Sequence, residues 1–110
     1  MSESSSDAPV LDLLASMTAA SLETSTLDLD VLMLVRIAAL VSVDASPASY
    51  LMNLRSAGEV GLDDEAVRGV LAAIAPIVGT ARIVSATTKI VRALGLAIEV
   101  AQMDEDDDLS

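Results

Sequence analysis

The sequence predicts an all-α fold, a compact bundle of about five helices. Its 110 residues are 53% hydrophobic but only 1% aromatic, a composition that fits helices packed through aliphatic side chains. Apolar residues recur at helical spacing in successive segments, and glycine and proline fall between those segments. A chain of this length forms one domain with a small core.

We expect three regions. Residues 1–8 are small, polar and acidic, which is typical of a disordered terminus. Residues 9–102 form the single helical domain. Residues 103–110 carry the acidic run Asp104–Asp108 and are predicted to be a disordered tail. That tail could bind a partner, although a run of like charges more often serves solubility.

The first predicted helix spans Val10–Leu22, with Pro9 at its first position. The second begins at Asp28 or Asp30, and its segment Val31–Val43 is apolar at nearly every position. A helix that is apolar all round belongs at the centre of a fold.

A short break at Asp44–Pro47 separates the second helix from the third. Ser46 fits an N-cap and Pro47 the first helical position, because proline lacks only an N–H that would be unpaired there. The third helix runs to about Gly58, and Gly61 permits the left-handed turn that follows. Its polar residues at helical spacing are Ser49, Asn53 and Ser56.

The fourth helix is capped by Asp63 and runs to about Ile77. Asp64 and Arg68 are spaced for an ion pair on its surface. The fifth helix spans Thr80 to about Ala101. The apolar stripe of the fourth helix consists of Val67, Val70, Leu71 and Ile74.

Charge and length exclude several classes of partner. The formal net charge is −11, and the six basic residues form no run, so nucleic acid and anionic lipid are poor partners. The apolar segment Val31–Val43 is too short to span a bilayer and contains Arg36. The N-terminus has no basic region of a signal peptide. We therefore expect a soluble cytoplasmic protein with no membrane partner.

The chain has no cysteine and no histidine. It therefore has no thiolate nucleophile and lacks the commonest metal ligand and general base. We expect no metal and no cofactor. The aliphatic excess is more than a small monomer easily hides, which favours a homo-oligomer.

One segment carries a resemblance to a known family. After the apolar helix come Ser46-Pro47-Ala48-Ser49 with Asn53, then Val60-Gly61-Leu62-Asp63-Asp64-Glu65, then the apolar segment Val67–Ala101. This order resembles the carboxymuconolactone decarboxylase and alkylhydroperoxidase D-like family over roughly residues 27–101. Where that family has a redox Cys-x-x-Cys followed by a histidine, this chain has Ser46, Ser49 and Asn53.

The resemblance implies a fold, an assembly and a ligand class. Members of that family form rings of three or six subunits, so it implies a homotrimer or homohexamer here. Their carboxymuconolactone-type substrates are acidic lactones, which implies a small acidic molecule as the ligand. Thiol peroxidase activity is excluded on chemistry, because a serine hydroxyl cannot cycle through a disulfide.

Arg36 is the first candidate ligand-binding residue. A guanidinium inside an apolar helix could hold a substrate carboxylate through two hydrogen bonds. The alternative is a structural ion pair with Glu59, Asp63 or Glu65, since an unpaired buried charge is costly.

Five further residues are candidates, each with a plainer alternative. Ser46 and Ser49 could bind a ligand, or a nearby base could make one a nucleophile; otherwise they are a helix cap and a packing residue. Asn53 could hold a ligand carbonyl, or a neighbour or water could satisfy it. Tyr50 could donate to an anion or fill the core. Glu65 is a candidate catalytic acid or base if buried, and otherwise a first-turn carboxylate.

Two functions follow from different classes. The first is a cysteine-free relative of that family that binds, or acts as a lyase on, a small acidic or lactone-like compound. The second is a non-catalytic homo-oligomeric scaffold or protein-interaction module. A pocket lined by Arg36 and Asn53, with no competing ion pair, favours the first. An Arg36 fully paired to a carboxylate in a closed region favours the second.

Overall fold

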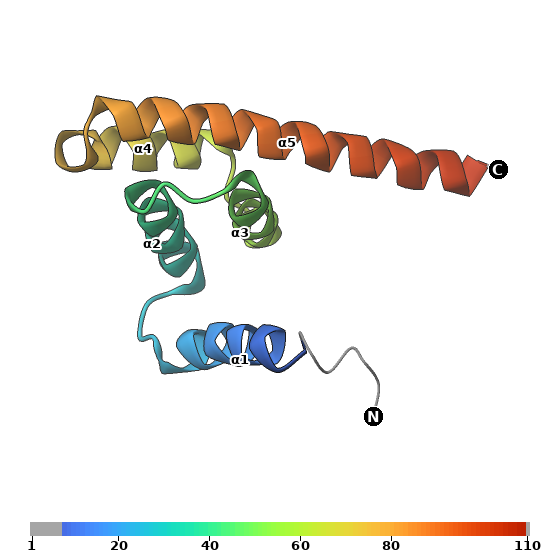
Figure 1. Cartoon of the computed structure of the whole chain (residues 1–110), viewed down its shortest axis with the longest axis horizontal. Coiled ribbons are helices and arrows are strands. Elements are labelled where there is room, and N and C mark those ends of the chain that lie inside the picture. The colour runs from blue at the N-terminus through green and yellow to red at the C-terminus, as the bar shows by residue number, and fades with distance from the viewer. Residues whose placement is uncertain (1–7, 110) are drawn as a thin grey trace.

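The helices occur where the sequence predicts them, and the all-α bundle is confirmed (Figure 1). The computed structural model describes the backbone of residues 8–109 and the side chains of residues 8–95. Of the segment expected to be disordered, only Ala8 is described, and it begins the first helix; residues 1–7 lie outside the described residues. The five helices are α1 (Ala8–Thr24), α2 (Leu29–Ser42), α3 (Pro47–Glu59), α4 (Asp64–Val78) and α5 (Thr80–Leu109).

Two predicted N-caps, Ser46 and Asp63, are confirmed with their side-chain hydrogen bonds, whereas Asp28 precedes α2 without one. Ser46 Oγ accepts a hydrogen bond from the backbone N–H of Ser49 at 3.3 Å, with Pro47 at the first helical position. Asp63 Oδ1 accepts from the N–H of Ala66 at 3.0 Å. Gly61 has a left-handed φ of +86°, as the turn after α3 requires.

The helices form two packed layers and one outlying helix. α4 and α5 run side by side in opposite directions, and α2 and α3 lie across one side of that pair (Figure 1). The core lies between these four helices. Its buried apolar residues are Leu32, Met33, Ile37, Val41, Tyr50, Ala57, Val67, Ala86, Ile90 and Ala93.

Helix α2 is central on one face only. Ile37 and Val41 are fully buried, but Val31 and Val35, which point away from the core, are 40% and 51% exposed. The prediction that α2 lies at the centre of the fold therefore holds for one of its faces and not for the other, because none of the described residues buries Val31 or Val35. The apolar side chains on that face are available to pack against another protein surface.

Helix α1 stands apart from the rest of the fold (Figure 1). It has no buried residue, and none of its residues belongs to the core or packs against it. Six of its large apolar side chains are between 40% and 63% exposed: Val10, Leu11, Leu13, Leu14, Met17 and Leu22. A helix of this length is marginal in water without packing, so α1 depends on contacts outside the core.

Helix α5 extends to Leu109, beyond the end that we predicted near Ala101. That boundary was wrong because no glycine or proline follows Gly95 to end the helix. Residues 103–109 of the expected tail are thus helical in backbone, and their side chains lie outside the described residues. Within residues 8–109, no helix is both long enough and apolar enough to cross a membrane.

Candidate functional site

A pocket lies between α1, α2 and α3. We call it the Arg36 pocket. Its volume is about 470 Å³. The pocket joins helix segments that are far apart in the sequence, and most of its lining side chains are polar. The lining residues are Met17, Thr18 and Ser21 of α1, Arg36 of α2, and Ser49, Met52, Asn53 and Ser56 of α3.

Arg36 is held by α1 and not by a carboxylate. Its Nη2 donates to Ser21 Oγ at 3.0 Å and to the carbonyl oxygen of Thr18 at 3.4 Å. Among the described side chains, the ion pairs are Arg68–Asp64 and Lys89–Asp44, so the expected structural ion pair of Arg36 is not formed. The half-buried guanidinium therefore keeps its positive charge uncompensated at the pocket wall.

The polar stripe of α3 also lines this pocket. Asn53 Nδ2 donates to the carbonyl oxygen of Ser49 at 2.9 Å, and Ser56 Oγ donates to that of Met52 at 3.3 Å. These bonds to their own helix fix the side chains on the pocket wall. Hydroxyl and amide groups in the same pocket as a guanidinium are suited to a small molecule with a carboxylate and neighbouring oxygens.

The other three candidate residues do not line this pocket. Ser46 is exposed at the N-cap of α3, where its Oγ lies 3.3 Å from Ser49 Oγ. Glu65 is exposed in the first turn of α4 and lines neither pocket described in this section. Tyr50 is completely buried in the core. The structure thus brings together Arg36, Ser49 and Asn53.

Tyr50 carries an unusual hydroxyl. The oxygen is buried and has no hydrogen-bond partner among the described residues. Burial raises the pKa of Tyr50, and the negative charge of Asp44 raises it further. The side chain is therefore neutral across the physiological range and acts as part of the core.

Sequence reasoning missed a polar cluster at the break between α2 and α3. Asp44 Oδ1 accepts from Ser85 Oγ at 2.7 Å and from Lys89 Nζ at 3.0 Å, and the Asp44 carbonyl accepts from Lys89 at 3.3 Å. The bond from Ser85, and then that from Lys89, hold the pKa of Asp44 below its usual range. The sequence signal near this cluster was the break at Asp44–Pro47.

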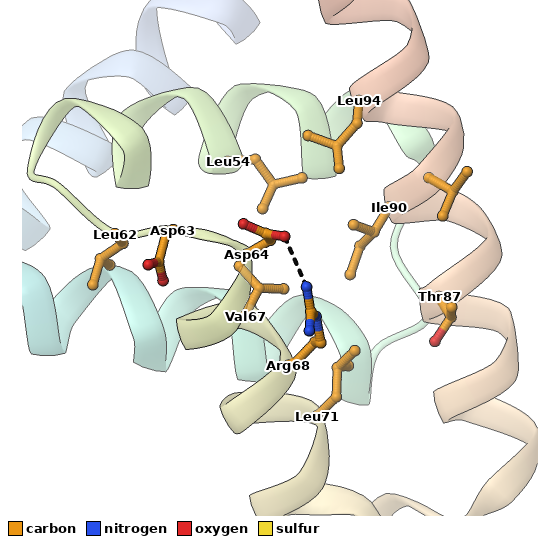
Figure 2. Close-up of a pocket in the computed structure, with 11 residues that line it drawn as sticks. Leu54, Leu62, Asp63, Asp64, Val67, Arg68, Leu71, Thr87, Ile90 and Leu94 are labelled. Atoms are coloured by element: carbon orange, nitrogen blue, oxygen red, sulfur yellow. Dashed lines mark hydrogen bonds and ion pairs between the residues drawn. The ribbon is translucent and has the colours of Figure 1, made fainter.

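A second pocket, which we call the aliphatic pocket, lies between α3, α4 and α5 (Figure 2). Its volume is about 490 Å³. Asp64 and Arg68 form their predicted ion pair at 2.8 Å on its edge, where both side chains are well exposed. Its apolar lining consists of Leu54, Leu62, Val67, Leu71, Ile90, Val91 and Leu94.

The lining of the Arg36 pocket is mostly polar, whereas that of the aliphatic pocket is mostly apolar. The Arg36 pocket offers one cation and several hydrogen-bonding groups, but none of its lining residues is a carboxylate or a lysine. It can bind and orient an anion, but its lining supplies no general base. The described residues contain no group of three or more carboxylates that could hold a metal ion.

Comparisons with known protein families, curated proteins and solved structures found no match to this chain. Its geometry is therefore the basis for a functional assignment.

Proposed function

We propose that this protein binds a small acidic molecule in the Arg36 pocket, as a cysteine-free relative of the carboxymuconolactone decarboxylase and alkylhydroperoxidase D-like family. The single observation that carries the proposal is the Arg36 guanidinium, which faces an open polar pocket without a carboxylate partner among the described side chains. Structural arginines inside a fold normally have such a partner.

The residues around Arg36 support the same ligand class. A carboxylate can take two hydrogen bonds from a guanidinium. Ser49, Asn53 and Ser56 line the same pocket and offer groups for a second oxygen, such as that of a lactone. Met17 and Met52 contribute apolar surface that adapts to different ligand shapes. An oxygen-rich acid of modest size fits these features best.

Binding is better supported than lyase chemistry. Proton transfer needs a group within reach of the reacting atom. Glu65, the candidate acid or base, is exposed in the first turn of α4 and does not line the Arg36 pocket, so it is not within reach of a ligand held there. We therefore assign the pocket to binding and leave Glu65 as a first-turn carboxylate of α4.

An NMR titration tests this proposal. The probe is γ-butyrolactone-γ-carboxylate, and its neutral methyl ester is the control ligand. The acid should shift amide signals of α2 and α3, whereas the ester should not. Arg36→Gln should weaken binding at least about tenfold, because hydrogen bonds to a charged group contribute about 1.5–3 kcal/mol. Arg55→Gln, which removes an exposed charge from the same neighbourhood, should leave binding unchanged. Equal binding by Arg36→Gln would refute the proposal.

A second candidate function is a homo-oligomeric scaffold, and one specific observation favours it. The large apolar side chains of α1 and the outer face of α2 are exposed within one chain, and such surfaces mark association sites in soluble proteins. A homotrimer or homohexamer would cover them. Both candidates involve α1, which lines the Arg36 pocket through Met17, Thr18 and Ser21 and also carries the exposed apolar side chains. The acidic, cysteine-free composition agrees with a cytoplasmic location for either.

A further inference from the structure

The contact between α1 and the remainder of the protein is concentrated at Arg36. Nη2 of this residue donates both of the hydrogen bonds that join α1 to α2, one to Ser21 Oγ and one to the Thr18 carbonyl. No residue of α1 is buried or packs against the core. The chain between α1 and α2 is only residues 25–28, so α1 can move but stays close to the pocket.

The same nitrogen is needed for a bound carboxylate. A guanidinium holds a carboxylate bidentately either through Nη1 and Nη2 or through Nε and Nη2. Both arrangements use an N–H of Nη2, which has two. Because Ser21 and Thr18 also accept from that nitrogen, a bidentate carboxylate competes with them for its N–H groups. The anion and α1 therefore compete for Arg36.

We propose that α1 is a lid over the Arg36 pocket, that the hydrogen bonds from Arg36 to Ser21 and Thr18 are its latch, and that an acidic ligand opens the lid by taking the guanidinium. A ligand shifts such an equilibrium only through its different affinity for the two states. Here that difference is the bond lost from Nη2 to α1. The ligand-driven step rests on the proposed function, whereas the latch does not.

Opening has a consequence for α1 itself. A helix of this length with no packing partner is marginal in water, so a detached α1 will fray. Hydrogen exchange of its backbone amides reports that local opening directly. The amides of α2 in the buried core provide the internal reference, because their exchange requires opening of the core.

The test measures amide exchange in the full chain by NMR, first without ligand. Ser21→Ala removes one acceptor of the latch and should speed exchange in α1 about fivefold, the effect of losing a hydrogen bond worth ~1 kcal/mol. Ser16→Ala is the matched control: it makes the same change of helix propensity on another face of α1, where Ser16 is exposed. An α1 exchange rate in Ser21→Ala equal to that in Ser16→Ala would overturn the proposal.

The second arm adds γ-butyrolactone-γ-carboxylate to the unmodified protein. The acid should speed exchange in α1 and leave the core amides of α2 unchanged, and the methyl ester should do neither. If the acid shifts signals of α2 and α3 while α1 exchanges as before, the lid is refuted and the proposed function stands. If the acid does not bind, the proposed function and ligand-driven opening are both refuted. Faster exchange of α1 in Ser21→Ala would then support the latch alone.

Discussion

Asp44 adopts a left-handed conformation, at φ +54°, and is the one non-glycine residue with positive φ in the part of the chain that the structure describes. Aspartate and asparagine tolerate this region better than other residues with a side chain. The conformation turns the chain from α2 into α3, and the bonds from Ser85 and Lys89 tie the turn to α5. Position 44 therefore requires a residue that tolerates a left-handed backbone and carries a negative charge to pair with Lys89.

These two requirements can be separated by Asp44→Asn, which keeps the backbone preference and removes the charge. The pKa of Asp44 is lower in the folded protein than the ordinary aspartate value of about 3.9. Its contribution to stability is therefore present above that value and is lost as the pH falls through the folded-state pKa. Urea unfolding between pH 7 and pH 3 should give a shallower acid decline for Asp44→Asn than for the wild type.

Asp12→Asn in α1 is the control for this pH series, since Asp12 makes no ion pair in the described residues. The control should follow the wild-type curve. An Asp44→Asn curve that is parallel to the wild type at every pH would contradict the assigned role of the ion pair with Lys89.

Tyr50 gives a second prediction at this scale. Its buried hydroxyl has no partner among the described residues, and an unsatisfied buried polar group is destabilising. Tyr50→Phe removes only that oxygen from a completely buried ring, so the free energy of unfolding should rise by about 1 kcal/mol. Urea unfolding measures it, and a clear loss of stability would mean that the hydroxyl is hydrogen-bonded in the folded protein.

At helix boundaries, some features follow from nearby residues alone, whereas others depend on packing between distant segments. Ser46, Asp63 and Gly61 were predictable because caps and left-handed turns depend on nearby residues. The end of α5 was not, because no residue after Gly95 signals a stop. The partner of Arg36 was not predictable either: Ser21 is fifteen residues away in another helix, and the sequence offered several carboxylates that suited it better.

Two glycines, one within α4 and one before it, test whether the local backbone conformation decides the effect of a substitution. Gly69 lies within the helix, and a Cβ there would meet nothing within 4 Å. Gly69→Ala should therefore stabilise the protein by about 0.5–1 kcal/mol through helix propensity and reduced unfolded-state entropy. Gly61→Ala has the same open surroundings but a φ of +86°, and should destabilise by about 1 kcal/mol.

Thermal unfolding of both variants checks the pair. Opposite shifts in melting temperature are expected, although the chemical change is identical. Shifts of the same sign would show that the backbone conformation after α3 is not the one described.

At the scale of the molecule, the polar stripe of α3 and Arg36 of α2 were recognisable as candidates before their arrangement was known. That they face one pocket depends on how α2 and α3 cross, which no local pattern encodes. The position of α1 over this pocket was equally beyond reach, because no local pattern shows that its apolar residues stay outside the core. The aliphatic pocket was missed for a related reason: its residues look like ordinary core positions.

The exposed face of α1 leads to a prediction about assembly. Leu13 is 60% exposed in one chain, so Leu13→Asp should leave the subunit folded but weaken self-association if α1 contacts another subunit. Ala19→Asp adds the same charge on the face of α1 that carries Asp12 and Glu23, about a third of a turn away from Leu13, and should associate like the wild type. Sedimentation velocity over a concentration series distinguishes them, and identical association of both variants would exclude this face of α1 as an interface.

The central claim is that each subunit holds a small acid on Arg36, and native mass spectrometry of the protein as purified tests it most directly. We expect a trimer or hexamer that carries a small acidic adduct, and the loss of that adduct in Arg36→Gln but not in Arg55→Gln. A monomer without an adduct, or an adduct that Arg36→Gln retains in full, would contradict it.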